Sequence, residues 1–112
     1  MNIVFTAQGS DWSSKMDARF GRAQFFVVYN EETETLTSLN NSDVENEAHG
    51  AGPKAAQKMA EAKAKVIITG NGPGGNAATV LEKLGVECFI GAGEMTIEEA
   101  YKAYKENKLN KF

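Results

Sequence analysis

Residues 66–77 read Val-Ile-Ile-Thr-Gly-Asn-Gly-Pro-Gly-Gly-Asn-Ala. The apolar start of this stretch is typical of a strand buried on both faces of a parallel sheet. Four glycines and a proline follow between residues 70 and 75, and a helical pattern then begins. Glycine admits positive φ angles and close approach of another group, and a helix start offers free N–H groups to an anion. The stretch therefore predicts one wall of a site for a negatively charged ligand, with a plain strand-to-helix turn as the alternative.

The composition indicates a single globular domain spanning residues 1–112, with 42% hydrophobic and 24% charged residues. A formal net charge of −3 disfavours a general nucleic-acid-binding protein. The single cysteine, Cys88, excludes an internal disulfide and a multi-cysteine zinc or iron–sulfur site within one chain. Because we find no basic leader and no long apolar segment, we expect a cytoplasmic protein without a membrane span.

Strand and helix patterns follow one another along the rest of the chain. The expected strands are residues 2–6, 24–29, 34–39, 66–69 and 86–90. The second and third are close enough to form an antiparallel hairpin, and the polar third strand suits a sheet edge. Expected helices begin at Pro53, near Ala77 and at a capping box over residues 96–99. The tail from Lys105 is polar, and we expect it to fray.

The order of these elements predicts an α/β fold with a mixed sheet. Strands joined through a helix run parallel by right-handed crossovers, which gives the strand order 3-2-1-4-5 with strand 2 antiparallel. The loops at residues 7–23, 49–52, 70–76 and 91–95 should then gather at one edge of the sheet. Ligands of open α/β sheets bind at the carboxyl ends of strands, where the strand order reverses. The predicted site therefore lies between strands 1 and 4.

Four motifs in this order resemble a known family. They are Met-Asp-Ala-Arg-Phe-Gly-Arg-Ala at residues 16–23, Phe-Phe at 25–26, His-Gly-Ala-Gly at 49–52, and Ile-Thr-Gly at 68–70 with Gly-Pro and Asn-Ala beyond. The chain resembles the dinitrogenase iron–molybdenum cofactor biosynthesis family, which includes NifX, the C-terminal domain of NifB and small stand-alone relatives. Here the glycine loop is longer and richer in glycine than the family's usual loop. The resemblance implies a ribonuclease H-like three-layer fold with a five-stranded mixed sheet and three helices.

The resemblance also implies a function: binding or carrying an anionic iron–sulfur or molybdenum-containing cluster, or its precursor, between donor and acceptor proteins. His49 is the candidate metal ligand because a neutral imidazole can ligate iron, molybdenum or copper, and Gly50 after it leaves room for a bulky guest. The alternative is that His49 caps the following helix or is simply exposed. The loop residues expected to contact the guest are Gly70, Asn71, Gly72, Gly74, Gly75 and Asn76.

Two arginines complete the candidate site. Arg19 and Arg22 can hold an anion by charge-assisted hydrogen bonds. The alternative is that they pair with the acidic residues Asp17, Asp43 or Glu45. Met16 and Met95 could offer soft sulfur, although methionine more often fills a core, and we expect Cys88 to be buried and inert.

The sequence favours a binding protein over an enzyme. The first strand carries no acidic residue of the kind a ribonuclease H-type nuclease needs, and His49 is the only imidazole that could serve a hydrolase nucleophile. Residues 70–75 fit Gly-x-Gly-x-x-Gly, but Glu87 begins the next strand instead of ending it, so a small-anion or nucleotide-binding module is the alternative. A protein-binding adaptor is a third possibility, and we expect a monomer or weak homodimer.

Overall fold

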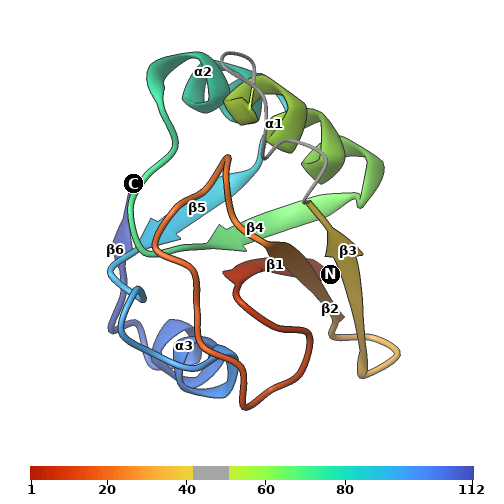
Figure 1. The fold of residues 1–112 in the computed structure, drawn as a ribbon, viewed down its shortest axis with the longest axis vertical. Coiled ribbons are helices and arrows are strands. Elements are labelled where there is room, and N and C mark those ends of the chain that lie inside the picture. The colour runs from red at the N-terminus through yellow and green to blue at the C-terminus, as the bar shows by residue number, and fades with distance from the viewer. Residues whose placement is uncertain (42–50) are drawn as a thin grey trace.

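The structure is a computed structural model that describes residues 1–41 and 51–112. Over these ranges the chain forms an open sheet flanked by helices (Figure 1). The strands are β1 (Asn2–Ala7), β2 (Phe25–Asn30), β3 (Thr35–Asn40), β4 (Ala64–Ile68), β5 (Glu87–Ile90) and β6 (Asn110–Lys111). The helices are α1 (Ala51–Glu61), α2 (Gly75–Lys83) and α3 (Ile97–Lys105). None of these helices has the length and apolar character needed to cross a membrane.

The strand order in the sheet is β3-β2-β1-β4-β5-β6. β1, β4 and β5 are parallel, and β2 is antiparallel to both of its neighbours, so the predicted order and directions are confirmed. The expected five strands are joined by a sixth, because the tail pairs with β5 through Ile90 and Asn110 instead of fraying. The Phe112 N–H also donates to the Cys88 carbonyl at 2.8 Å. A two-residue strand has too little alternation for a sequence pattern to reveal it.

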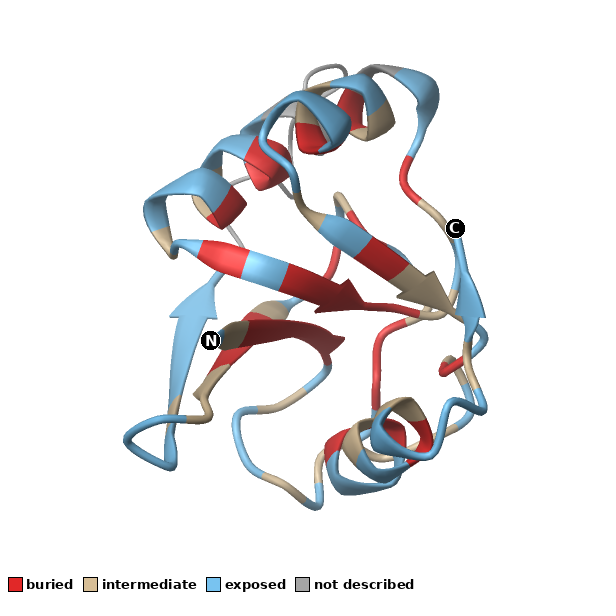
Figure 2. Cartoon of the chain, turned by 180° about the vertical axis from the view of Figure 1, so that it is seen from behind, coloured by how far each residue is buried: buried red, intermediate tan, exposed pale blue. Residues whose placement is uncertain are grey.

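The two faces of the sheet are covered separately, which gives the predicted three layers. α1 and α2 lie on one face and α3 lies on the other (Figure 1). Val4, Ile67 and Cys88 point into the core under α1 and α2, together with Ala55, Ala56 and Met59 of α1. Alternate residues of the same strands, such as Ile3 and Phe5, point into the core under α3. This two-sided burial is the red band through β1 and β4 in Figure 2.

Local signals mark the start of α3 and the end of α2, whereas α1 and α2 begin two residues earlier than expected, at Ala51 and Gly75. Thr96 and Glu99 form a reciprocal capping box at the start of α3, with the Glu99 N–H donating to the Thr96 hydroxyl. Gly85 follows α2 with φ of 73°, the left-handed conformation that ends many helices. The capping box was predicted from the sequence and is confirmed.

Candidate functional site

Three loops meet where β1, β4 and β5 end, as the topology predicted. The backbone N–H of Asn71 donates to the Ala18 carbonyl at 2.7 Å, and the Gly91 N–H donates to the Gly70 carbonyl at 3.0 Å. A Cβ built on Gly70 would lie 2.7 Å from the Cα of Ala18 and 2.9 Å from the Cα of Gly93. Gly70 is therefore the contact point of all three loops, and only a residue without a side chain fits there.

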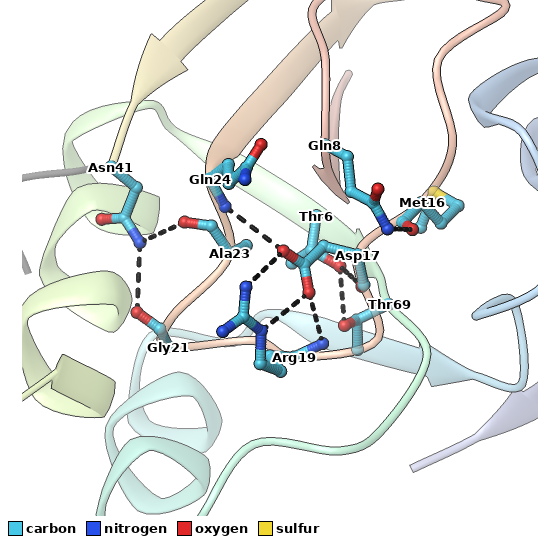
Figure 3. A network of polar contacts seen from close by, with 10 residues as sticks. All are labelled: Thr6, Gln8, Met16, Asp17, Arg19, Gly21, Ala23, Gln24, Asn41 and Thr69. Atoms are coloured by element: carbon cyan, nitrogen blue, oxygen red, sulfur yellow. Dashed lines mark hydrogen bonds and ion pairs between the residues drawn. The ribbon is translucent and has the colours of Figure 1, made fainter. Parts of the chain in front are cut away.

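A pair of buried threonines lies beneath this contact, between the ends of β1 and β4. The Thr6 and Thr69 hydroxyl oxygens are 2.8 Å apart, and Thr6 also donates to the Asp17 carbonyl at 2.7 Å (Figure 3). Both side chains are fully buried. These hydroxyl groups connect the ends of β1 and β4, where the strand order reverses, to the loop that follows β1. Sequence reasoning missed them because a threonine at a strand end is an ordinary strand residue.

We call residues 16–23 the arginine loop; its conformation depends on the buried carboxylate of Asp17, which is 4% exposed. One oxygen accepts from the Arg19 backbone N–H at 3.0 Å and from Nε at 3.1 Å. The other accepts from Nη2 of Arg19 at 3.1 Å and from the Gln24 N–H at 3.3 Å (Figure 3). Burial alone would raise the pKa of Asp17, but the hydrogen bonds and charge of Arg19 outweigh it and lower the pKa.

The two arginines stay on the surface while the residues around them are buried. Met16, Phe20 and Ala23 are buried, and the Phe20 ring lies 5.9 Å from that of Phe26. Arg19 and Arg22 are exposed, with 58% of the Arg19 side chain accessible. The predicted alternative for Arg19, pairing with Asp17, is confirmed, and Asp17 raises the pKa of Arg19. Of the five guanidinium N–H groups of Arg19, the one on Nε and one on Nη2 donate to Asp17, so the other three are directed away from this carboxylate.

The Asn41 side chain holds the C-terminal end of the arginine loop. The Asn41 side chain, 1% exposed, donates to the carbonyls of Gly21 at 3.1 Å and Ala23 at 2.9 Å (Figure 3). Its oxygen accepts from Nζ of Lys58 on α1 at 2.6 Å. Sequence reasoning missed Asn41, because asparagine after a polar strand is ordinary loop composition.

The glycine loop leads into a helix start that is open to an anion. Gly74 is the N-cap of α2 and provides no side-chain cap, and the first turn contains no acidic residue. Gly74 and Gly75 are exposed, and a Cβ on either would meet nothing within 4 Å. Phe20 and Ala77 belong to one core cluster, so the arginine loop and the first turn of α2 lie on the same side of the sheet.

The reason for the glycines differs from the one the sequence suggested. Among the described residues, the glycines with positive φ are Gly85 and Gly91, not those of the loop at 70–75. Close approach is what the loop uses: Gly70 contacts two backbones, and the Phe112 ring lies directly against Gly72. The positive-φ argument was therefore wrong for this loop, and the close-approach argument is confirmed.

His49 and Gly50 lie outside the described residues, so their place relative to the arginine loop stays a prediction. Asp43 and Glu45, the other acidic partners considered for the arginines, also lie outside them. Within residues 1–41 and 51–112, no three His, Cys, Asp or Glu side chains come together in a way that could hold a metal ion.

Of the sulfur-containing residues considered for the site, Met16 and Cys88 are buried, and Met95 is partly buried against the core under α3. Met16 is fully buried, as expected of core filling. Cys88 is buried, and burial raises the pKa of its thiol to about 11. Cys88 lines a hollow of about 430 Å³ between α2 and the tail, together with Pro73, Leu81 and Phe112. Because Glu82 and Glu87 also line this hollow, it is not the electropositive site that the sequence predicted.

Comparison with known proteins identifies the family. Residues 1–107 match the family described as dinitrogenase iron-molybdenum cofactor. The chain belongs to this family. The apo form of the orange protein from Desulfovibrio gigas is similar at 30% identity and a TM-score of 0.92, over 99% of this chain and 92% of that one. A candidate NifB protein from Thermotoga is similar at 31% identity and a TM-score of 0.83, over 98% and 91% of the two chains.

No curated protein sequence matches the chain. The family match nevertheless covers nearly its full length, and both solved relatives share its fold over nearly their full lengths. The resemblance carried by the four sequence motifs is thereby confirmed, as is the α/β fold it implied.

Proposed function

We propose that this protein binds an anionic metal–sulfur cluster, or a precursor of one, and carries it between donor and acceptor proteins during metallocofactor assembly. The observation that carries the proposal is the arginine loop, which is fixed at the carboxyl ends of β1 and β4 and presents two exposed arginines. The family name supports the class of guest, since it refers to the iron–molybdenum cofactor of dinitrogenase. The orange protein is described in an apo form, that is, without its bound group.

The Arg19 guanidinium is ordered before any ligand arrives. Asp17 holds it through two side-chain bonds of 3.1 Å, so binding an anion costs less side-chain entropy than it would for a mobile arginine. The same carboxylate cancels much of the Arg19 charge. In this proposal Arg22 and the open N-terminus of α2 add to the attraction of an anion, and Arg19 supplies directed N–H donors.

In this proposal the glycine loop supplies backbone donors and His49 supplies a metal ligand. The N–H groups at the start of α2 are suited to sulfide or oxygen atoms of a cluster because no side chain caps them. Gly74 and Gly75 leave space for the guest, since a Cβ at either position meets no neighbour. His49 follows from the sequence motif alone.

Anaerobic reconstitution tests the proposal. Metal-free protein is incubated with ferrous iron, molybdate and sulfide, desalted, and examined by visible absorbance and metal analysis. We expect a protein-bound coloured species that is lost in His49→Ala and reduced in Arg22→Gln. Lys102→Gln is the matched control, because it removes one exposed positive charge from α3 on the opposite face of the sheet.

The alternatives give different results. If no coloured species forms, or if Arg22→Gln and Lys102→Gln behave alike, the proposed site is wrong. Binding of ATP or inorganic phosphate to metal-free protein, measured by calorimetry, would support a small-anion or nucleotide-binding module. Absence of binding in every titration would favour the adaptor.

A further inference from the structure

The two edges of the sheet differ sharply. One edge is β6, which has two residues and includes Lys111. The other edge is β3, which has six residues, Thr-Leu-Thr-Ser-Leu-Asn, all in unbroken register with β2. Five of the six are exposed, and β3 is pale blue along most of its length in Figure 2. A long exposed edge with regular register is a template for another strand.

The backbone of β3 presents unused hydrogen-bonding groups to solvent. The Asn41 N–H donates to the Gln24 carbonyl at 2.9 Å, which fixes the phase of the antiparallel ladder. In that phase residues 35, 37 and 39 bond to β2, and the N–H and C=O groups of Leu36 and Ser38 point away from it. Within the described part of the chain, nothing pairs with those outward groups of Leu36 and Ser38.

This edge lacks the devices that usually prevent strand addition. Natural edge strands carry charged residues, proline or a bulge, or they are very short. β3 contains no charged residue, no proline and no glycine, and its pairing with β2 shows no register shift. It also exposes an apolar side chain, since Leu39 is 38% accessible. These features suit recognition by β-strand addition.

Charge at one end of β3 selects the kind of partner. The hairpin turn before it carries Glu34, which is exposed, and Glu32, whose side chain is 85% exposed and lies 3.8 Å from the N-terminal amine of Met1. A strand added antiparallel to β3 places its C-terminal end beside this turn. A second copy of this chain offers no lysine or arginine on its own β3 and carries the same net charge of −3.

We propose that β3 is a docking edge for an extended segment of a partner protein, uncharged over about six residues and basic at its C-terminal end. The segment continues the sheet beyond β3, bonding to Leu36 and Ser38, and its basic end lies beside Glu32 and Glu34. A six-residue strand pair buries much less than a stable interface requires, so the contact is transient. Such a contact suits a partner that must be released.

The test uses the peptide acetyl-Thr-Val-Thr-Val-Thr-Lys-Lys-amide with ¹⁵N-labelled protein. We expect the amide signals of Leu36 and Ser38 to shift and to gain protection from hydrogen exchange. Ser38→Pro removes an outward N–H without removing a bond to β2, and should weaken binding about fivefold to tenfold. Ser38→Lys is a second edge variant that keeps the backbone donor, and Gln57→Lys on exposed α1 is its charge-matched control.

Charge is tested separately. Glu34→Lys, or replacement of the two peptide lysines by glutamates, should weaken binding. The difference in affinity from the original protein and peptide should shrink at high salt. Two results would overturn the proposal: equal binding by Ser38→Pro, Ser38→Lys and Gln57→Lys, or shifts that leave Leu36 and Ser38 unaffected. Sedimentation without peptide tests whether a second copy of this chain occupies β3. A dimer in which the Leu36 and Ser38 amides are protected from hydrogen exchange would assign this edge to a second copy. Cluster reconstitution in Ser38→Lys should be unchanged, so the two proposals fail independently.

Discussion

Removing the Asp17 carboxylate should destabilise the whole protein and not only the arginine loop. Asp17→Ala takes the acceptor from two backbone N–H groups, those of Arg19 and Gln24, and breaks the pair with the Arg19 guanidinium. Each amide left without its partner in this partly buried place costs about 1 kcal/mol. The ion pair adds less than about 1 kcal/mol because the Arg19 side chain is 58% exposed and water screens it.

The free energy of unfolding should therefore fall by about 2–3 kcal/mol in Asp17→Ala, which corresponds to a drop in Tm of about 10 °C for a domain of this size. Urea unfolding followed by the fluorescence of Trp12 measures it. Trp12 is the single tryptophan, and it contacts the rings of Tyr29 and Tyr101 on the α3 side of the sheet. It therefore reports unfolding of the domain and not a local change in the arginine loop.

The pH dependence gives an independent check on the same residue. Because the pKa of Asp17 is lowered in the folded state from 3.8, its contribution is fully present well above that value and is lost as the pH falls through the folded-state pKa. The stability difference between wild type and Asp17→Ala should shrink over that acid range. The control is Glu94→Ala, which removes an exposed carboxylate from a neighbouring loop. If Asp17→Ala costs no more than Glu94→Ala at neutral pH, the buried carboxylate does not stabilise the arginine loop as described.

Three further predictions follow from single contacts. Gly70→Ala should lower the free energy of unfolding by about 2 kcal/mol, because its Cβ would lie 2.7 Å from the Ala18 Cα. Gly75→Ala should raise it by about 0.5 kcal/mol, because a Cβ there meets no neighbour. Thermal unfolding compares the two variants, and equal Tm values would contradict the close-approach argument. The Cys88 thiol, buried and with its pKa raised to about 11, should react with a thiol reagent at pH 8 far more slowly in folded than in urea-unfolded protein, and equal labelling rates would contradict its burial. Thr96→Ala should lower the free energy of unfolding by about 1 kcal/mol through loss of the capping box, while Thr96→Ser should retain most of it, as measured in urea.

Much of the fold was predictable because its signals are local. The apolar run at residues 66–68, the capping box at Thr96 and the left-handed Gly85 each depend on a few neighbouring residues. Once the strands and helices were assigned, chirality of the crossovers and the short hairpin left one strand order. The two-residue β6 was not predictable, because only its contact with β5 makes it a strand.

Part of the candidate site was likewise predictable from the sequence, and part was not. The order of strands and helices along the chain was enough to predict which loops lie at one edge of the sheet, and residue type was enough to select Arg19, Arg22 and the glycine loop as candidates for binding an anion. The folded arrangement was needed to select Asp17 among the possible partners of Arg19, and to show that Asn41 and Thr6 hold the arginine loop and that Gly70 is needed for close packing. The physical reason is that periodicity and capping are encoded by nearest neighbours, whereas a buried hydrogen bond depends on where distant segments meet. Thr6 and Thr69 are 63 residues apart in the chain, and their hydroxyl oxygens are 2.8 Å apart.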